Sequence, residues 1–502
     1  MKAASSNQNN IFNKIVRQGG IGIIGKATFF LLGFFSNILL ARYMGTKGLG
    51  QYQLGLVAAQ LIVTFAVLGL DKGFVRYLPM LEARKSDESS QLIMQGVVFS
   101  FLVSIALTCL LFLFSPILAA RFYGSPEMAH VLRQFALYLP IITLIRISNG
   151  ITNGLKRADV STIIHNILSP ILFLGLVVSI IYFDQGLSGA IFARQLSHFI
   201  VMIVSVVFII RYFEFKSIKI FDLVQFKQLF AFSAPLLMIG IIYLLLGQMD
   251  VLMLGYFVKE QDVGTYSVAV RISGLIIIGL EIGLPIVGPY FSHFSESRDI
   301  KLISDIFKNS TKFISYLGLS IFLIIFVLRI ELLSIFGTSF ISGSSVLLIL
   351  SCGHLSNAFT GPTGQLLVMT GKQKWEMTNS ICVVIINFFL NIILIPKFGL
   401  TGAALATAIS IIVINFAKLV EVMQIYRIHP YSLGYLSGII AIFSAAAVTY
   451  FIRMKLIDSQ LTIILTIVLS GIGFVIILSI CFWLFGFSRK DKIFLKQILQ
   501  KR

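Results

Sequence analysis

Charged residues are scarce in this sequence. Asp, Glu, Lys and Arg together make up only 12% of its 502 residues, while hydrophobic residues make up 57%. An ordinary soluble domain is about 25% charged, and no soluble fold could cover this much apolar side chain. Lipid must therefore serve as the solvent, and the composition predicts an all-α polytopic membrane protein.

Acidic residues are the scarcer charge, because 21 Asp and Glu oppose 40 Lys and Arg and leave a formal net charge of +19. In a soluble protein this excess would suggest binding to nucleic acid. Here the basic residues flank apolar segments, so we expect membrane lipid as a partner and no nucleic acid. The four cysteines lie in apolar segments without metal-ligand spacing, so no disulfide, metal site or cofactor is expected.

Three further absences narrow the function. The polar N-terminus has no short apolar stretch with a small-residue cleavage site, so we expect the first span to act as an uncleaved signal. No G-x-x-x-x-G-K-[ST] motif occurs, which argues against direct use of ATP. The loops predicted to be outside are short and carry no cluster of acid and base groups, so the protein is not expected to be an enzyme.

Apolar segments long enough to cross a bilayer recur along the chain, since a spanning helix needs about 20 residues. We predict fourteen spans, at 19–41, 50–71, 92–115, 133–155, 161–183, 187–210, 228–254, 265–291, 311–329, 344–369, 376–395, 400–425, 433–452 and 461–486. With the N-terminus in the cytoplasm, 27 of the 40 Lys and Arg residues lie inside, 9 lie outside and 4 lie within spans. The positive-inside rule therefore supports both the number of spans and cytoplasmic termini.

An internal repeat divides the chain. The motif GLSGAIFA at 186–193 recurs as GLTGAALA at 399–406, an offset of 213 residues, and Gly50 matches Gly264 at an offset of 214. Each copy holds six spans, so the two copies are parallel and related by an axis along the membrane normal. We predict an N-terminal lobe at 1–210, a cytoplasmic linker at 211–227, a C-terminal lobe at 228–430, and two extra spans with a basic tail at 431–502.

The motifs at the helix junctions resemble those of a known family. They are the Tyr-turn-Gly-x-Tyr pattern after the first span (39–52), its copy after the seventh (252–266), and the G-L-[ST]-G-A motif. Together they resemble the Wzx-type polysaccharide flippases, over about residues 10–430. These belong to the multidrug/oligosaccharidyl-lipid/polysaccharide superfamily, which also holds the MATE exporters and the lipid II flippases. The resemblance implies a MATE-like fold in a bacterial inner (plasma) membrane.

Charged residues inside the spans are the first candidates for function, because such residues usually face a protein interior or water. Four are basic and two are acidic: Lys26, Arg146, Arg194, Arg271, Asp250 and Glu281. The lipid-linked sugar that the family resemblance implies is an anion, and Arg can hold phosphate in a bidentate manner. A cation exporter would be expected to show the opposite, acidic excess.

Polar residues also repeat at helical spacing, which places them on one face of spans 1, 4, 6 and 10. For spans 1, 4 and 10 the simplest explanation is that these faces line a water-filled cavity. The expected substrate-binding residues are Arg146, Arg194, Lys26, Arg271, Asn37, Asn149, Asn153, His354 and Asn357. Asp250 and Glu281 are the expected ion-coupling residues, for H⁺ or Na⁺.

Structural roles compete with these functional ones. Lys26 lies near the inner end of its span and would also reach the interface by snorkelling. Asp250 would equally well close a salt bridge between helices. Arg271 and Glu281 are ten residues apart, so on a continuous helix they share a face but do not pair. A histidine in a span is more often a hydrogen-bonding group between helices than a proton carrier.

Two transport functions remain. The favoured one is a flippase that moves a polyprenyl-pyrophosphate-linked oligosaccharide, a unit of O-antigen, capsule or exopolysaccharide, to the outer leaflet by ion-coupled alternating access. Its partners would then include polysaccharide assembly proteins. The alternative is a MATE-type multidrug/cation antiporter, against which the basic excess and the two extra spans count.

Overall fold

The computed structural model describes residues 2–82, 88–212, 223–432, 434–458 and 462–481. Throughout this part of the chain the regular structure is helical, which confirms the all-α fold class. Most of the predicted linker and the basic tail lie outside the described residues. The described chain forms two compact units, residues 1–264 and 265–502. The division into lobes at 211–227 stays a prediction.

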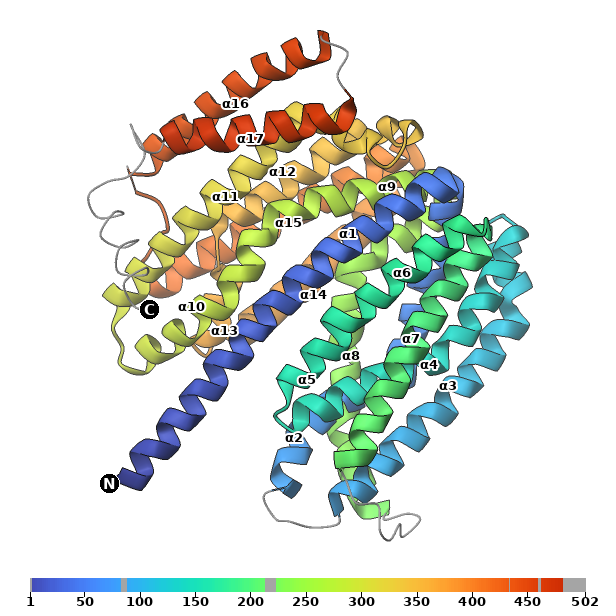
Figure 1. Ribbon diagram of the computed structural model, residues 1–502. Coiled ribbons are helices and arrows are strands. Elements are labelled where there is room, and N and C mark those ends of the chain that lie inside the picture. The colour runs from blue at the N-terminus through green and yellow to red at the C-terminus, as the bar shows by residue number, and fades with distance from the viewer. Residues whose placement is uncertain (1, 83–87, 213–222, 433, 459–461, 482–502) are drawn as a thin grey trace. The chain divides into compact units, whose positions relative to one another are not determined.

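The first unit contains most of the N-terminal helices (Figure 1). They are α1 (Lys2–Val67), α2 (Leu70–Glu82), α3 (Glu88–Arg121), α4 (Glu127–Gly154), α5 (Ala158–Thr162), the π-helix η1 (Ile163–Leu168), α6 (Ser169–Tyr182), α7 (Gly186–Tyr212) and α8 (Leu223–Phe257). α4 lies at the centre, packed against α1, α2, α3 and α7, while α8 packs against α1 and α2. The seventh predicted span therefore belongs to this unit.

The long first helix is two spans joined at a sharp bend. At Gly45 the backbone leaves the helical region, with φ 66° and ψ −171°. Before the bend, the chain runs along the fifth predicted span. A Cβ on Gly25 would overlap the Thr162 methyl group, and the Tyr43 hydroxyl donates to the Asp184 carboxylate at 2.9 Å. The first span therefore runs parallel to the fifth span.

After the bend the chain returns along α4. The Tyr52 and Phe135 rings pack edge to face with centroids 5.7 Å apart, and a Cβ on Gly154 would lie 2.6 Å from the Phe74 carbonyl oxygen. The contacts thus move from the beginning of α4 to its end. In the described residues, thirteen helical stretches are long and apolar enough to cross a membrane. Because the first of them holds two spans, the fourteen predicted crossings are confirmed.

The repeated G-L-[ST]-G-A motif builds a tight corner between helices. Gly186 has φ +62°, a region that glycine enters without strain. The Tyr43 hydroxyl accepts a hydrogen bond from the Gly186 amide at 2.7 Å and fixes this corner. A Cβ on Gly189 would lie 2.9 Å from Ile180, so the motif's second glycine lets the helices on either side of the corner approach closely.

The second copy of the motif has the same geometry. Gly399 has φ +55°, and a Cβ on Gly402 would overlap the Leu394 carbonyl oxygen at the end of the preceding helix. Gly50 and Gly264 show the repeat in another way, because they pack against each other inside the first unit. A Cβ on either one would lie 3.0 Å from the amide nitrogen of the other.

The second unit consists of the remaining helices. They are α9 (Glu260–Ser273), which starts at the end of the first unit, the 3₁₀ segment η2 (Gly274–Ile277), α10 (Ile278–Glu296), α11 (Ile300–Ser334), the 3₁₀ segment η3 (Thr338–Gly343), α12 (Ser344–Thr360), α13 (Thr363–Met369), α14 (Gln373–Phe398), α15 (Leu400–Tyr426), α16 (Tyr435–Asp458) and α17 (Ile463–Cys481). α12 packs against α11 and α15.

The tenth predicted span, 344–369, is not one continuous helix. α12 ends at Thr360 because Gly361 takes φ +67° and Pro362 follows, and α13 begins separately. At Gly361 a Cβ would overlap the Thr311 side chain, so the chain approaches α11 too closely for a larger residue. The break shortens the hydrophobic helix, and the span is completed instead by η3 at its beginning.

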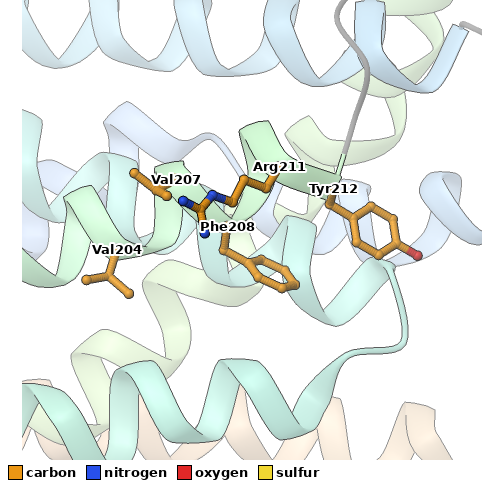
Figure 2. A pocket seen from close by; sticks show the side chains of 5 residues that line it. All are labelled: Val204, Val207, Phe208, Arg211 and Tyr212. Atoms are coloured by element: carbon orange, nitrogen blue, oxygen red, sulfur yellow. The ribbon is translucent and has the colours of Figure 1, made fainter.

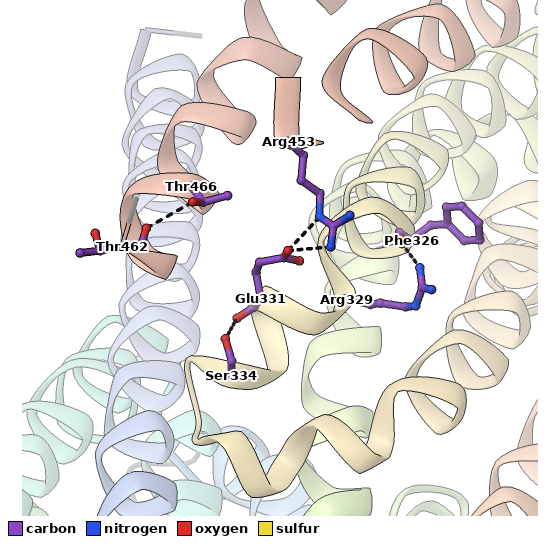
Figure 3. A network of polar contacts seen from close by, with 7 residues as sticks. All are labelled: Phe326, Arg329, Glu331, Ser334, Arg453, Thr462 and Thr466. Carbon is purple, nitrogen blue, oxygen red and sulfur yellow. Dashed lines mark hydrogen bonds and ion pairs between the residues drawn. The ribbon is translucent and has the colours of Figure 1, made fainter. Parts of the chain in front are cut away.

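The two extra helices, α16 and α17, form a hairpin that packs on α11 (Figure 1). The apolar contact includes Tyr316, Leu323 and Phe474. Figure 3 shows the polar contact at the other end of α16, where the Arg453 guanidinium binds the Glu331 carboxylate at 2.7 Å. Both side chains are about nine-tenths buried. This ion pair fixes α16 to α11.

Candidate functional site

The polar stripe of the fourth span lies inside the first unit. Arg146 is half-buried, and its Nη1 donates to Thr64 Oγ1, 3.2 Å away on the returning arm of α1. Asn149 Oδ1 accepts from Ser161 of α5 and from Asn153 Nδ2, the latter at 2.9 Å. The structure therefore brings these three predicted residues together, and each already bonds within the unit.

Arg194 occupies a second polar position in the first unit. Its Nε donates to the Tyr52 hydroxyl at 2.9 Å, and its guanidinium carbon lies 3.7 Å from the centre of the Phe173 ring. His198, one turn later, contacts the Arg194 carbonyl oxygen through Nδ1 at 3.0 Å and packs against the fully buried Tyr138. Arg194 thus has a structural role, because it joins α7 to α1 and α6.

Tyr43 and Tyr52 explain the first sequence signature. Tyr43 holds the corner at Gly186, and Tyr52 holds Arg194 two turns further along α7. Both tyrosines therefore fix the sixth predicted span to the bend of α1. The signature records packing between spans and carries no information about a ligand.

The two predicted residues of the first span differ in exposure. Asn37 is buried, and its Nδ2 donates to the Gly33 carbonyl oxygen at 2.7 Å, so its amide satisfies its own helix. Lys26 is exposed. The neighbouring Gly25 packs against Thr162, where the fifth span changes to π-helical geometry at Ile163–Leu168. Single π-helical turns within α-helices are frequent at functional sites, and this one was not predicted from the sequence.

Four of the predicted site residues belong to helices of the second unit. His354 and Asn357 are half-buried on α12, and His354 Nδ1 has no hydrogen-bond partner among the described residues. Arg271 and Glu281 are both exposed. The 3₁₀ segment η2 lies between them, so the shared face expected for a continuous helix stays a prediction.

The two expected ion-coupling residues belong to different units. Asp250 is half-buried near the end of α8 in the first unit, and Glu281 lies in the first turn of α10 in the second. An ionic cluster that the sequence interpretation missed joins α14 to α15. There Lys418 binds the Glu376 carboxylate, and Asn379 Nδ2 donates to Glu421 at 2.7 Å. Its members are 42 residues apart, so no local spacing reveals it.

A shallow groove of about 300 Å³ lies at the end of α7 (Figure 2). Its lining comes from that helix alone: Val204, Val207, Phe208, Arg211 and Tyr212. The guanidinium of Arg157, the residue just before α5, lies 5.7 Å from the centre of the Phe208 ring. None of the predicted site residues lines this groove. In the described residues no group of three or more His, Cys, Asp or Glu could hold a metal ion.

The fold matches solved membrane transporters along most of the chain. The lipid II flippase MurJ, in an inward closed conformation, aligns with a TM-score of 0.69 at 18% identity, covering 92% of this chain and 98% of MurJ. A multidrug resistance MATE family transporter aligns with a TM-score of 0.64 at 16% identity, covering 80% of this chain and 94% of the other. The chain is therefore a multi-pass membrane protein with the fold of this transporter superfamily.

The sequence comparison identifies the family within that fold. The profile of the polysaccharide biosynthesis protein family matches residues 15–295, more than half of the chain. A second profile, MatE, matches residues 235–393. The chain belongs to the polysaccharide biosynthesis protein family, as the junction motifs predict.

Curated relatives carry names that fit this family. The probable low-salt glycan biosynthesis flippase Agl15 of Haloferax volcanii is 29% identical over 163 residues, which is 32% of this chain and 34% of Agl15. The match thus spans about a third of that relative. The capsular polysaccharide biosynthesis protein CapF of Staphylococcus aureus is 27% identical over 55% of this chain and 68% of CapF. Stage V sporulation protein B of Bacillus subtilis is 20% identical over 84% and 87%.

Proposed function

We propose that the protein flips a polyprenyl-pyrophosphate-linked oligosaccharide from the cytoplasmic to the outer leaflet of an inner (plasma) membrane. The observation that carries this proposal is the family match over residues 15–295, which covers the first unit from residue 15 onward, with Arg146 and Arg194. A relative named as a glycan biosynthesis flippase and another named for capsular polysaccharide support it. The oligosaccharide and membrane lipid are then the partners, together with polysaccharide assembly proteins.

The proposed mechanism is transport without covalent chemistry. The two six-helix lobes alternate in access to the two faces of the membrane, with both termini in the cytoplasm. Arg146 and Arg194 hold the pyrophosphate as bidentate hydrogen-bond donors. The amides of Asn149, Asn153 and Asn357 contact sugar hydroxyls, and the remaining predicted residues complete the path.

Ion coupling is part of the same proposal. Asp250 and Glu281, one in each unit, are the groups that would take up H⁺ or Na⁺ during the cycle. A carboxylate inside a span is costly unless it is paired or functional. The gradient of the coupling ion across the membrane would supply the energy for transport.

The test is translocation of a fluorescent polyprenyl-pyrophosphate-oligosaccharide in proteoliposomes. We expect Arg146→Ala to slow transport by about tenfold or more, because each charge-assisted contact to phosphate contributes on that scale. The matched control is Arg133→Ala, on the same helix, whose guanidinium bonds Ser115 and lies over Phe112. The control should keep more than half of the wild-type rate. Equal loss in both variants would remove the assigned role of Arg146.

Arg194 needs a separate comparison because it also holds Tyr52. Arg194→Ala is therefore measured together with its melting temperature, and Arg194→Lys keeps the charge. Transport lost in Arg194→Ala without a lower melting temperature supports substrate contact.

A second function is favoured by one observation, the MatE profile match at residues 235–393. It is a multidrug/cation antiporter. Wild-type protein that leaves the lipid-linked sugar in place, but drives proton-linked efflux of an organic cation, would replace the flippase by this function.

A further inference from the structure

α2 is an amphipathic helix that follows the second span. Leu70, Phe74 and Leu78 are completely buried on one side. Lys72 and Arg76 are exposed on the other side, one turn apart. Residues with this spacing on a helix have Cβ atoms about 5–6 Å apart. The two cations therefore form one pair on the surface of the first unit.

α2 is fixed tightly against α8. A Cβ on Gly69 would overlap the Ser233 carbonyl oxygen, and a Cβ on Gly73 would overlap the Ser233 hydroxyl. Leu229 of α8 is completely buried in the same contact. Such close backbone approach leaves little freedom between the two helices, so the positions of Lys72 and Arg76 relative to α8 are set by packing.

Each cation lies against an aromatic ring of α8. The Arg76 guanidinium carbon is 4.2 Å from the centre of the Phe232 ring, and Lys72 Nζ is 5.8 Å from the centre of the Tyr243 ring. Tyr243 is 67% exposed, so its ring is accessible from outside. A guanidinium stacked on a ring keeps its N–H donors at its edge, where they can bind a further group.

The charge of this pair is uncompensated in the described part of the chain. Some other cations there bind carboxylates, since Lys47 binds Glu127 and Arg453 binds Glu331. Neither Lys72 nor Arg76 makes an ion pair with a described residue. Two adjacent cations held by ring contacts, with no carboxylate, constitute a preorganised receptor for an anion of two negative centres.

We propose that Lys72 and Arg76, with Tyr243 and Phe232, form a loading site that binds the pyrophosphate of an amphiphilic substrate at the inner membrane interface. Two phosphates in series match two cations one helical turn apart, whereas a phospholipid headgroup offers one phosphodiester. The exposed Tyr243 ring provides a face against which a sugar can stack. The site lies at the end of the second span, in a segment that the charge distribution places in the cytoplasm, where the substrate would arrive.

This inference rests on the proposed function for its substrate, but binding can be measured without transport. The full-length protein in detergent is titrated with farnesyl pyrophosphate, with farnesyl monophosphate and with inorganic pyrophosphate. Nanodiscs containing phosphatidylglycerol test the phospholipid source separately. The variants are Lys72→Gln/Arg76→Gln and, as a charge-conserving exchange, Lys72→Arg/Arg76→Lys. The matched control is Lys372→Gln/Lys374→Gln, two exposed lysines on the same predicted side of the membrane.

We expect the glutamine pair to weaken farnesyl pyrophosphate binding by about tenfold or more, because two charged contacts are lost. The exchange variant and the control should stay within about twofold of wild type. Unchanged binding in the glutamine pair would overturn the inference, as would an equal loss for phosphatidylglycerol, which would make the surface a general phospholipid contact. If the wild-type protein flips the lipid-linked sugar but the glutamine pair still binds farnesyl pyrophosphate normally, this site is refuted and the proposed function stands. If the glutamine pair loses that binding but the wild-type protein flips no lipid-linked sugar, the proposed function is refuted and the site stands.

Discussion

The ion pair between Arg453 and Glu331 offers the sharpest test of the energetics of the fold. The change is Arg453→Met, which keeps the length of the side chain but removes its charge. The buried carboxylate of Glu331 is then left without its positively charged partner. Its Oε1 currently receives both contacts from Arg453, at 2.8 Å from Nε and 2.7 Å from Nη2, while Oε2 is buried without a hydrogen-bond partner in the described chain.

The expected magnitude follows from burial. Only 13% of the Arg453 side chain and 9% of the Glu331 side chain are exposed, so water screens the pair little. Removing one partner of such a pair costs about 3–5 kcal/mol, because the other charge remains buried and unpaired. Removing both partners in favour of apolar residues is neutral or even stabilising. Glu331→Leu/Arg453→Met should therefore recover most of the loss.

The measurement is the melting temperature of the purified protein in detergent, read as the loss of the folded peak in size-exclusion chromatography after heating. The expected order is wild type and double variant together, with Arg453→Met well below them. A single variant that melts with wild type would show that the carboxylate is hydrated or neutral. A double variant as unstable as the single one would show that packing of the Arg453 side chain, and not its charge, fixes α16 to α11.

Two further changes test the packing of the first unit. Gly50→Leu should sharply lower the yield of folded protein, because a Cβ at this position overlaps the Glu260 carbonyl oxygen. The control Gly175→Leu should fold normally, because nothing lies within 4 Å of a Cβ at that position. Equal yields of the two variants by size-exclusion chromatography would contradict the predicted effect. Tyr43→Phe should destabilise the corner at Gly186 by about 1 kcal/mol through its lost hydrogen bonds. Amide hydrogen exchange measures this, and unchanged protection of Gly186 would contradict it.

The fold was predictable where the physics is local. Apolar length and the alternation of Lys and Arg indicated fourteen spans, and the structure contains them. The glycine motifs indicated a repeat, and Gly186 and Gly399 share a left-handed backbone. The break at Gly361 was not predicted, although Gly361 and Pro362 are local signals for it; the close approach of Thr311, from a helix fifty residues earlier, cannot be derived from hydropathy. The hydropathy of a segment depends only on the residues of that segment and does not include packing against another helix.

The candidate site was less predictable, for the same reason. Helical spacing correctly placed Asn149 and Asn153 on one face, since they are hydrogen-bonded to each other. It did not show that Ser161, on the next helix, completes the group. Lys72 and Arg76 were assigned to a cytoplasmic loop because they are charged, and only the structure shows the rings beneath them. Side-chain partners that come from other helices require the three-dimensional packing.

The contact between Gly50 and Gly264 has a consequence for the origin of the chain. Thr46 and Glu260, which supply the opposing carbonyl oxygens, are separated by the same 214 residues as the two glycines. Equivalent atoms therefore meet across a local two-fold axis, as they do in the interface of a symmetric homodimer. This is the arrangement expected if two identical subunits were joined into one chain with their contact retained. In such an ancestor one substitution would alter both sides of the contact at once, whereas in the fused chain a substitution at one glycine leaves the other in place.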